Sequence, residues 1–320
     1  MKEAEEKMLL EVRNISRTYQ SRKRQPVYAL REVSFSLREG CCMGVVGESG
    51  CGKSTLCRVI AGIEKPDRGE ILYQGNQADY RKNRSSLQMV FQNSMDAVNV
   101  HLKVGRILAE PLENFTGLNR NQREQEVERL LELVGLSAED KTKYPRQFSG
   151  GQLQRICIAR ALAANPKLLL LDEPLSSLDV SVQAQLLNLL SDLKKELRLT
   201  CLLVSHDLEA VYYLADKLLV MYGGAAVEEI EDIRDFHVLK HPYTRRLLEA
   251  GELENKLLET ENALAMERIP EAEERESRTV VFREGCVYVG HCPNAEEKCF
   301  RERPKLVQRE AGHRIACHLQ

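Results

Sequence analysis

The chain has 320 residues, of which 43 % are hydrophobic and 29 % charged, and its formal net charge is −2. This composition supports a packed core and argues against global disorder, and the near-neutral charge argues against a protein that mainly coats nucleic acid. No apolar run approaches the roughly 20 residues of a membrane span, and the polar Met1–Lys7 lacks a signal peptide's apolar stretch, so we expect a cytosolic protein unless a partner holds it at a membrane.

Strand patterns occur first near the N-terminus and then at intervals along the chain. Leu9–Ile15 and Val33–Leu37 alternate apolar and polar residues with period two, as half-buried strands do. Three nearly unbroken apolar runs are typical of strands buried on both faces: Met43–Val46, Lys167–Leu171 and Cys201–Val204.

Helical patterns lie between these strands. They cover Ser54–Ala61, Gln122–Val134, Gly150–Ala164, Val180–Leu197 and Leu208–Leu214. Buried strands that alternate with helices predict an α/β domain with a largely parallel sheet, beside which the N-terminal strands would form an antiparallel β subdomain. The stretch from about Val104 to Leu136 has helical patterns but no strand, so it predicts a helical subdomain.

The character of the chain changes after Leu248. Nine glutamates and four basic residues fall between Glu252 and Arg278, which is typical of a solvated helix or a flexible linker. The segment from Val280 to Gln320 is rich in Cys, Pro, Gly and Arg, and it is too small to bury a core unaided. We therefore expect a main domain over residues 8–250, an acidic linker over 251–279 and a small Cys-rich C-terminal extension over 280–320.

The ten cysteines are unevenly distributed. In the cytosol, where thiols stay reduced, they do not predict a disulfide framework. Six are scattered over the first two hundred or so residues, most beside apolar neighbours, as Cys157 and Cys201 are, and these are interpreted as small core residues. The other four lie in the last 35 residues, a concentration that the core does not explain.

Residues 47–55 read Gly-Glu-Ser-Gly-Cys-Gly-Lys-Ser-Thr between a predicted buried strand and a predicted helix, which is the full P-loop pattern in its confirming context. Glycines let backbone N–H groups surround phosphates, the lysine reaches the β- and γ-phosphates, and Ser54 offers a hydroxyl to Mg²⁺. The alternative, a tight glycine-rich turn without a ligand, fits this context poorly. The residues expected at the nucleotide are Gly47, Ser49, Gly50, Cys51, Gly52, Lys53, Ser54 and Thr55.

A second predicted strand ends in two carboxylates, Asp172 and Glu173. An acid at the end of a buried strand beside a P-loop is placed to hold Mg²⁺, normally through water, and we assign this role to Asp172. Because strand side chains alternate, Glu173 would point elsewhere, where it would polarise the water that attacks the γ-phosphate. Taken alone, such a pair is usually the charged start of a loop, but its position after a P-loop favours the metal and base roles.

The segment Phe148-Ser149-Gly150-Gly151-Gln152 leads into a predicted helix. Ser149 suits an N-cap, and two glycines expose the backbone of the helix N-terminus, so this is a second anion-binding end. The segment resembles the signature loop of ABC ATPases, which usually has Leu where this chain has Phe148. The resemblance implies a head-to-tail pair of such domains, in which Ser149, Gly151 and Gln152 face the ATP held by the partner's P-loop.

Other elements of the ABC ATPase family appear in the expected order over Leu10–Ile230. The resemblance implies that Gln92 senses Mg²⁺ and couples to a membrane subunit, and that His206 holds the γ-phosphate and positions the water. It further implies that Tyr19 stacks on adenine and that Asp179, in the Ser-Ser-Leu-Asp loop, lies at the nucleotide.

Two further segments narrow the resemblance. Lys240–Leu248, which contains His-Pro-Tyr-Thr, and the Cys-rich C-terminal segment resemble ATPases of oligopeptide, dipeptide and nickel importers. The resemblance implies an ATPase subunit that energises di- or oligopeptide import. The seven residues after Gln92, Asn-Ser-Met-Asp-Ala-Val-Asn, look nearer to nickel-importer ATPases, so import of nickel or a nickel chelate stays open.

Two other classes also stay open. One is a soluble ABC ATPase of repair or translation, although those generally carry two cassettes or a large insertion. The other is an ATPase accessory to a metabolic enzyme assembly such as carbon–phosphorus lyase. The importer resemblance implies as partners a second ABC ATPase subunit, normally a paralogue, two membrane permease subunits and an extracytoplasmic solute-binding protein. It places the chain at the cytoplasmic face of the cell membrane, with no nucleic acid partner.

The four C-terminal cysteines are Cys286, Cys292, Cys299 and Cys317. Four thiols in a segment without its own core suggest that a metal or cluster stabilises it, but the spacing names no cofactor. It lacks the Cys-x₂-Cys pairs of common zinc sites and matches neither common ferredoxin pattern. Zinc, unliganded thiols and two disulfides are alternatives. Some peptide-importer ATPases hold a [4Fe–4S] cluster here, and this resemblance favours an iron–sulfur cluster.

Overall fold

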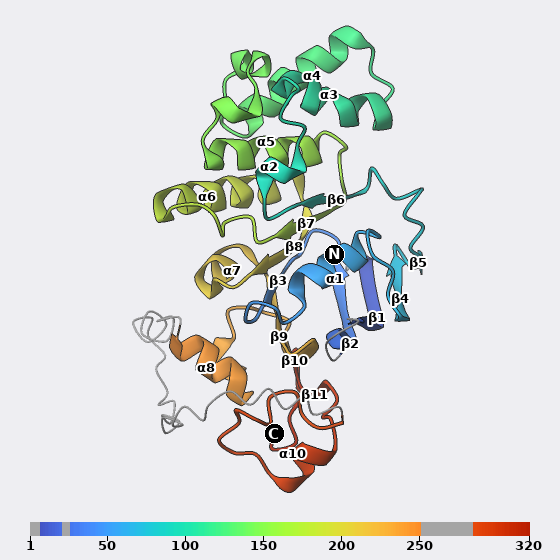
Figure 1. Cartoon of the computed structure of the whole chain (residues 1–320), viewed down its shortest axis with the longest axis vertical. Helices are drawn as coiled ribbons and strands as arrows, with labels where there is room; N and C mark the ends of the chain where they lie inside the picture. The colour runs from blue at the N-terminus through green and yellow to red at the C-terminus, as the bar shows by residue number, and fades with distance from the viewer. Residues whose placement is uncertain (1–6, 21–25, 251–283) are drawn as a thin grey trace, which may run out of the picture.

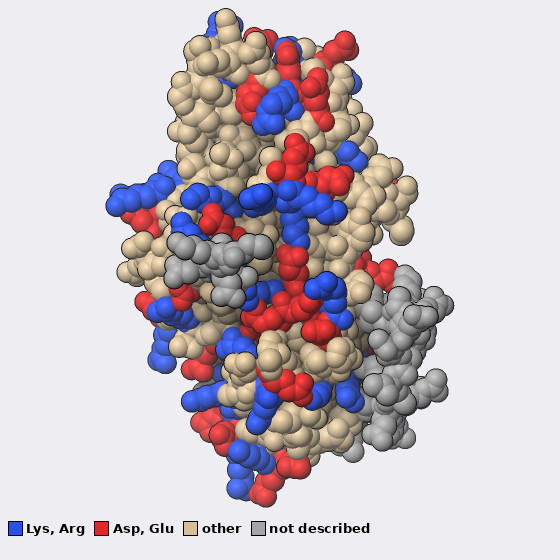
Figure 2. Space-filling model, turned by 180° about the vertical axis from the view of Figure 1, so that it is seen from behind, with Lys and Arg blue, Asp and Glu red and all other residues tan. Residues whose placement is uncertain are grey.

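A computed structural model of the chain describes residues 7–20, 26–250 and 284–320. The predicted acidic linker, 251–279, lies outside the described residues. Figure 1 shows the described elements along one long axis, with helices α3 and α4 at one end, the sheets in the middle and the C-terminal segment at the other end. Figure 2 shows basic and acidic side chains interleaved over the lower part of one face.

The N-terminal strands form a separate four-stranded antiparallel sheet in the order β2-β1-β4-β5. Its strands are β1 (Met8–Tyr19), β2 (Val27–Arg38), β4 (Arg68–Tyr73) and β5 (Asn76–Gln77). The buried residues of β1 are Leu9, Leu10, Val12 and Ile15, and the register with β2 shifts at several points along the strand, between Met8 and Leu10 and again between Val12 and Thr18. The predicted antiparallel subdomain is therefore confirmed, with longer strands than the alternation predicted.

The second sheet has eight strands in the order β11-β12-β10-β9-β3-β8-β7-β6. Its parallel part runs from β9 through β6. These strands are β3 (Cys42–Val46), β6 (Leu87–Val90), β7 (Leu168–Asp172), β8 (Thr200–Ser205) and β9 (Lys217–Tyr222). The largely parallel α/β sheet predicted from the buried apolar runs is thus confirmed. Strands β6 and β9 were not predicted.

The buried strands separate two hydrophobic clusters. Within β7, Leu169 and Leu171 belong to one cluster, and Leu168 and Leu170 belong to the other. Because successive strand residues point to opposite faces, this arrangement buries both faces of the sheet. The physical consequence is an unbroken apolar sequence in β7, which is why periodicity of two is absent there.

Helices cover both faces of this sheet. The helices that follow the strands are α1 (Lys53–Ile60), α5 (Gly150–Leu162), α6 (Val180–Leu197) and α7 (Leu208–Leu214). Shorter turns of helix are α2 (Ser94–Ala97), η1 (Ala138–Thr142), η2 (Pro145–Gln147) and η3 (Phe236–Val238). All four long helices fall on predicted helical patterns, and their ends differ from the predicted ones by at most a few residues.

The stretch predicted as helical between Val104 and Leu136 contains α3 (Val104–Phe115) and α4 (Arg120–Leu133). Helix α4 begins with a capping box, in which the Asn119 side chain accepts from the Gln122 N–H and Gln122 bonds back to the Asn119 backbone. Both helices add residues to the cluster that also contains α5. They therefore extend the α/β core rather than pack by themselves.

The C-terminal segment 284–320 joins the main sheet. It contains α10 (Glu297–Arg301), β11 (Val307–Glu310) and β12 (His313–Ile315), and β12 pairs antiparallel with β10 (Ala225–Ile230). This pairing supplies the backbone partners and packing that a short segment lacks by itself. Helix α8 (Pro242–Ala250) lies between β10 and this segment in the chain. No helix of the described residues is long and apolar enough to cross a bilayer.

Candidate nucleotide site

The P-loop connects β3 to α1 at the carboxyl end of the parallel strands, the edge at which such sheets bind ligands. Gly52 is the N-cap of α1 and has a φ of 106°, a left-handed conformation that favours glycine. A Cβ atom on Gly52 would lie 2.1 Å from the Ala29 carbonyl oxygen, and one on Gly47 would lie 2.1 Å from that of Met221. The surrounding backbone therefore requires glycine at both positions.

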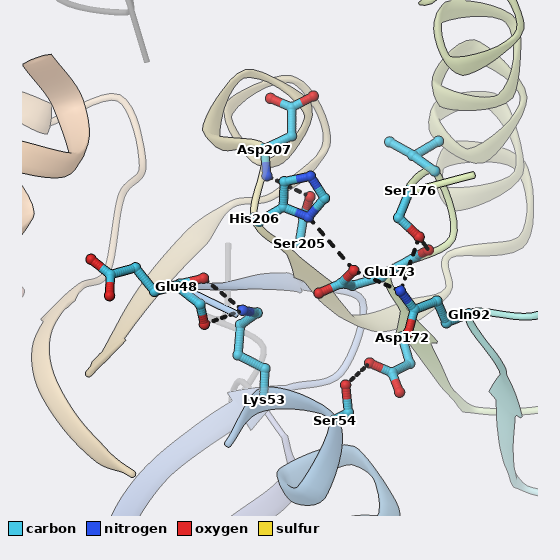
Figure 3. A network of polar contacts seen from close by, with 12 residues as sticks. Glu48, Lys53, Ser54, Gln92, Asp172, Glu173, Ser176, Ser205, His206 and Asp207 are labelled. Atoms are coloured by element: carbon cyan, nitrogen blue, oxygen red, sulfur yellow. Dashed lines mark hydrogen bonds and ion pairs between the residues drawn. The ribbon is translucent and has the colours of Figure 1, made fainter. Parts of the chain in front are cut away.

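Lys53 lies inside this loop and is only 4 % exposed. Its ammonium donates to the Gly47 carbonyl at 2.6 Å and to the Glu48 carbonyl at 3.0 Å, as Figure 3 shows. Both of these acceptors are neutral carbonyls, and no carboxylate of the described residues forms an ion pair with Lys53. The positive charge of this buried ammonium is therefore not compensated. The loop is thus suited to an anion.

The next residue along α1 connects the P-loop to β7. The Ser54 hydroxyl donates to Asp172 Oδ1 at 2.8 Å, and Asp172 is buried. Burial raises the pKa of Asp172, and the hydrogen bond from Ser54 opposes this rise. A hydroxyl and a carboxylate that face each other are oxygen ligands of the kind Mg²⁺ prefers.

Glu173 turns to the opposite side from Asp172 because it has a φ of 46°, in the left-handed region. Its carboxylate accepts from Gln92 Nε2 at 3.0 Å, and His206 Nδ1 lies 3.6 Å away (Figure 3). Gln92 also donates to the Ser176 hydroxyl at 3.3 Å. Residues from three separate segments therefore meet at the Glu173 carboxylate, whose predicted role as base stays a prediction. Ser176 was missed, although it begins the Ser-Ser-Leu-Asp loop.

Tyr19 lies at the end of β1, near the P-loop side of α1. Its hydroxyl donates to Glu64 Oε2 at 2.6 Å and is 3.4 Å from the Thr55 hydroxyl. The Arg17 guanidinium lies 5.2 Å from the centre of its ring. The ring is thus close to the P-loop helix, as its predicted role requires.

The predicted signature loop lies at the start of α5. Ser149 is its N-cap, with its hydroxyl accepting from the Gln152 N–H at 3.3 Å in a capping box. A Cβ atom on Gly151 would lie 2.3 Å from Val182 Cγ1, so α6 requires glycine there. Asp179 is the N-cap of α6 and accepts from the Val182 N–H at 3.0 Å.

The structure does not bring this second helix end to the P-loop. Ser149, Gly150 and Gln152 are exposed, and no hydrogen bond between described residues joins them to residues 47–55. The two helix N-termini predicted to bind anions thus differ within the described residues: the P-loop holds a buried lysine, Lys53, whereas the start of α5 is exposed at Ser149, Gly150 and Gln152.

The four C-terminal cysteines come from different parts of the segment 284–320. The pKa of Cys286 is raised to about 11, chiefly by burial and to a smaller extent by the charges of Cys299, Cys317 and Cys292. The pKa of Cys292 and that of Cys317 are also raised. Burial is the largest cause for both, and the charges of neighbouring cysteines add to it. Among the described residues no group of three or more His, Cys, Asp or Glu is close enough to hold a single metal ion.

The six other cysteines carry no such arrangement. Five of them are buried in the two hydrophobic clusters or beside them, and Cys41 is half-buried, in keeping with their predicted role as small core residues. Burial raises the pKa of the Cys157 thiol to about 11, so it stays protonated at neutral pH.

Comparison with known proteins gives consistent relatives. The family described as ABC transporter matches residues 30–176. The dipeptide transport ATP-binding protein DppF of Haemophilus influenzae is 42 % identical, over 92 % of this chain and 90 % of that protein. The putative oligopeptide transport ATP-binding protein YkfD of Bacillus subtilis is 40 % identical, over 97 % of this chain and 95 % of that protein.

Solved structures agree. The cbiO1 protein of Clostridium perfringens, part of the ABC transporter complex cbiONQ, has a TM-score of 0.64 at 26 % identity, over 78 % of this chain and all (100 %) of that chain. The ATP-binding cassette MJ0796, in a dimeric post-hydrolysis state bound to ADP and Pi, has a TM-score of 0.64 at 27 % identity, over 71 % of this chain and 100 % of that chain. The chain therefore belongs to the ABC transporter ATP-binding proteins of the oligopeptide and dipeptide family.

Proposed function

We propose that this chain is the ATP-hydrolysing subunit of an importer for dipeptides and oligopeptides. The observation that carries the proposal is the sheet edge at which the P-loop, Asp172 and the Glu173–Gln92–His206 group meet, combined with an exposed signature loop. This edge of the sheet would hold one nucleotide. The exposed helix end would contact a second nucleotide, which another ATPase subunit holds.

At the P-loop end, we assign the phosphates to the P-loop backbone and Lys53. Ser54 and Asp172 would hold Mg²⁺, with Gln92 beside them, because these side chains supply the oxygen ligands. When bound, Mg²⁺ neutralises charge on the β- and γ-phosphates. Tyr19 would stack on adenine.

Glu173 is the proposed general base. Its carboxylate is held by the Gln92 amide at 3.0 Å, and its neighbour at 3.6 Å is the His206 ring, which would bind the γ-phosphate. A carboxylate held from two sides is restrained in the direction from which it would take a proton of the attacking water.

At the exposed end, Ser149, Gly151, Gln152 and Asp179 would face the nucleotide of a second ATPase subunit. The capped N-terminus of α5 directs its N–H groups and the positive end of its dipole outward. The relatives named as oligopeptide and dipeptide transport proteins favour a paralogous ATPase as that subunit, with two permeases and a solute-binding protein, and a peripheral position at the cytoplasmic face of the membrane.

Co-purification from detergent-solubilised membranes tests the proposal. We expect the chain to be recovered with a second ATPase and two permeases, and the reconstituted assembly to show ATPase activity that rises when the solute-binding protein carries a peptide. Stimulation by a nickel chelate instead would replace the peptide assignment, and co-purification with a soluble enzyme assembly would replace transport.

For the C-terminal segment, we infer a [4Fe–4S] cluster held by Cys286, Cys292, Cys299 and Cys317. In every pair among these four thiols, the charge of one raises the pKa of the other. All four therefore lie within electrostatic reach of one another. Among the described residues no group of three or more His, Cys, Asp or Glu could hold a single metal ion. A cluster whose irons are bound by separate cysteines needs wider spacing than the single zinc ion with its short Zn–S bonds.

Anaerobic purification followed by iron, zinc and sulfide analysis and visible absorption tests this inference. We expect iron and sulfide in equal amounts. Zinc without sulfide would assign the thiols to a zinc site, and a metal-free but folded segment would leave them as unliganded thiols.

A further inference from the structure

A tyrosine outside the nucleotide motifs bonds directly to the P-loop. The hydroxyl of Tyr243, in α8, accepts a hydrogen bond from the Glu48 N–H at 2.9 Å. The carbonyl of the same peptide unit belongs to Gly47, and it accepts from Lys53 Nζ at 2.6 Å. Because a peptide unit is planar, a partner on its N–H also sets the direction of its carbonyl.

We propose that Tyr243 is a positioning residue for ATP binding, which orients the Gly47–Glu48 peptide and, through its carbonyl, the ammonium of Lys53. The inference rests on the proposed role of Lys53 at the phosphates. It gives a function to the His-Pro-Tyr-Thr segment, which the nucleotide motifs leave without one.

Tyr243 is itself held firmly. It is 1 % exposed, and its backbone N–H donates to His241 Nδ1 at 3.1 Å. Burial lowers the pKa of His241 to about 4, so the ring is neutral at pH 7 and keeps an acceptor for this bond. The Glu228 carboxylate, wholly buried in β10, accepts from the Lys240 N–H at 2.7 Å and from the His241 N–H at 3.2 Å. The start of α8 is therefore fixed to the main sheet.

The C-terminal segment holds Tyr243 from the other side. The ring of Tyr288 lies 5.4 Å from the ring of Tyr243 and 5.0 Å from that of Tyr222, centre to centre. Tyr288 is 2 % exposed, so these rings form a closed cluster. His313 Nε2 lies 2.8 Å from the Glu228 carboxylate that fixes the start of α8.

A second contact leads from this segment to the P-loop. Val287 packs against Gly223, at whose Cα an added Cβ would lie 3.4 Å from Val287 Cβ. The next residue, Gly224, donates its N–H to the Cys51 carbonyl at 3.0 Å. Residues 287 and 288 thus contact two separate supports of the P-loop, and we expect the C-terminal segment to strengthen ATP binding through them.

Nucleotide affinity of the full chain with Tyr243→Phe tests the proposal. Phenylalanine keeps the ring contacts but leaves the Glu48 N–H without its partner, so the binding-competent loop becomes less populated. We expect the dissociation constant for Mg-ATP, measured by calorimetry, to rise about threefold to tenfold, the range that one hydrogen bond is worth. The KM of the assembled transporter for ATP should rise by a similar factor, while the melting temperature should stay within a few degrees of the wild type.

Tyr222→Phe is the matched control. Tyr222 belongs to the same cluster, its ring being 4.6 Å from that of Tyr243, but its hydroxyl bonds to no described residue. We expect wild-type affinity. A loss in Tyr222→Phe as large as that in Tyr243→Phe would overturn the proposal, because the effect would then reflect general disturbance of the cluster. Wild-type affinity in Tyr243→Phe would overturn it as well.

Lys53→Ala separates this inference from the proposed site. If Lys53→Ala abolishes binding while Tyr243→Phe binds normally, the site stands and the positioning role fails. If Lys53→Ala binds normally, the role of Lys53 itself fails.

Tyr288 provides the test of the C-terminal contact. Tyr288→Phe keeps the ring and should bind ATP as the wild type does, whereas Tyr288→Ala should match the loss seen in Tyr243→Phe. Tyr288→Leu, which fills more of the space, serves if the alanine variant unfolds. Wild-type affinity in both truncated variants would show that Tyr243 positions the loop without help from this segment.

Discussion

The P-loop and the signature loop each present the N-terminus of a helix, but their surroundings differ. The P-loop is bound from outside by Tyr243, Gly224 and Asp172, and Lys53 within it is buried. The signature loop is exposed at Ser149, Gly150 and Gln152, and within the described part of the chain the Ser149 hydroxyl bonds only to its own helix. The first end is thus organised by contacts with other parts of its own chain, whereas the second is organised by the capping box of its own helix.

This difference teaches which half of the site can act alone. A preformed loop binds with little loss of conformational freedom, so nucleotide affinity should reside in the P-loop side. Hydrolysis requires charge stabilisation from all sides, so turnover should depend on the exposed end and on the subunit that it meets. Variants of the two ends should therefore change nucleotide affinity and turnover separately.

The largest effect is expected for Glu173→Gln. The amide keeps the size of the side chain but cannot take a proton from water, so turnover should fall about 10²- to 10⁴-fold while ATP still binds. Steady-state hydrolysis by the assembled transporter and equilibrium binding measure the two parts. Wild-type turnover would remove Glu173 from the role of base.

Ser149→Arg should break the exposed half alone. A bulky cation at the capped helix end would disturb the contact with the partner's nucleotide, and we expect turnover of the assembly to fall about a hundredfold. ATP affinity of the isolated chain should be unchanged, because its P-loop does not contact Ser149. Full hydrolysis by an isolated chain that light scattering shows to be monomeric would contradict the division between the two ends.

Acid should destabilise the fold through His241, which bonds to the Tyr243 N–H behind the P-loop. Burial lowers the pKa of His241 to about 4 from its usual 6.5, so between these values the unfolded chain binds a proton that the folded chain does not. Stability therefore falls as the pH decreases through this range, by on the order of 3 kcal/mol near pH 4.

His241→Asn provides the control for this prediction. Asparagine offers an acceptor to the Tyr243 N–H but does not titrate. Denaturant unfolding at a series of pH values should give a flatter profile for the variant between pH 4 and 6.5. Parallel profiles would mean that other groups cause the acid sensitivity.

The smallest effect is expected for Ser149→Ala in the isolated chain. Loss of the N-cap hydroxyl should lower the free energy of unfolding by about 1 kcal/mol, measured in denaturant. The same variant also isolates the cost of the cap from the added charge in Ser149→Arg. A change well above this value would mean that Ser149 has structural partners beyond its own helix.

Local signals in the sequence were sufficient for much of this molecule. The strand–loop–helix context of Lys53, the apolar run before Asp172 and the serine before Gly150 predicted β3, α1, β7 and the cap of α5, because each pattern reports on its own backbone. The separate contacts of Asp172 and Glu173 matched the prediction from strand alternation, but Glu173 lies beyond β7 and takes its direction from a left-handed φ of 46°.

Other elements were hidden from such signals. The strand β12 is short, and its pairing with β10 joins residues more than eighty positions apart. Local periodicity therefore does not predict this strand or its pairing. Likewise β9 and β10 follow each other too closely for their apolar patterns to separate.

The sequence by itself thus determined the nucleotide chemistry, because the P-loop and its carboxylates act through residue types at fixed local spacing. Only the tertiary structure decided that the P-loop is bound by residues from other elements and that the signature loop is not. It alone brought Tyr243 and Tyr288 to the back of the P-loop, through the buried carboxylate of Glu228. Contacts across such sequence distances depend on how the sheet folds, and that is a property of the packed chain rather than of any one segment.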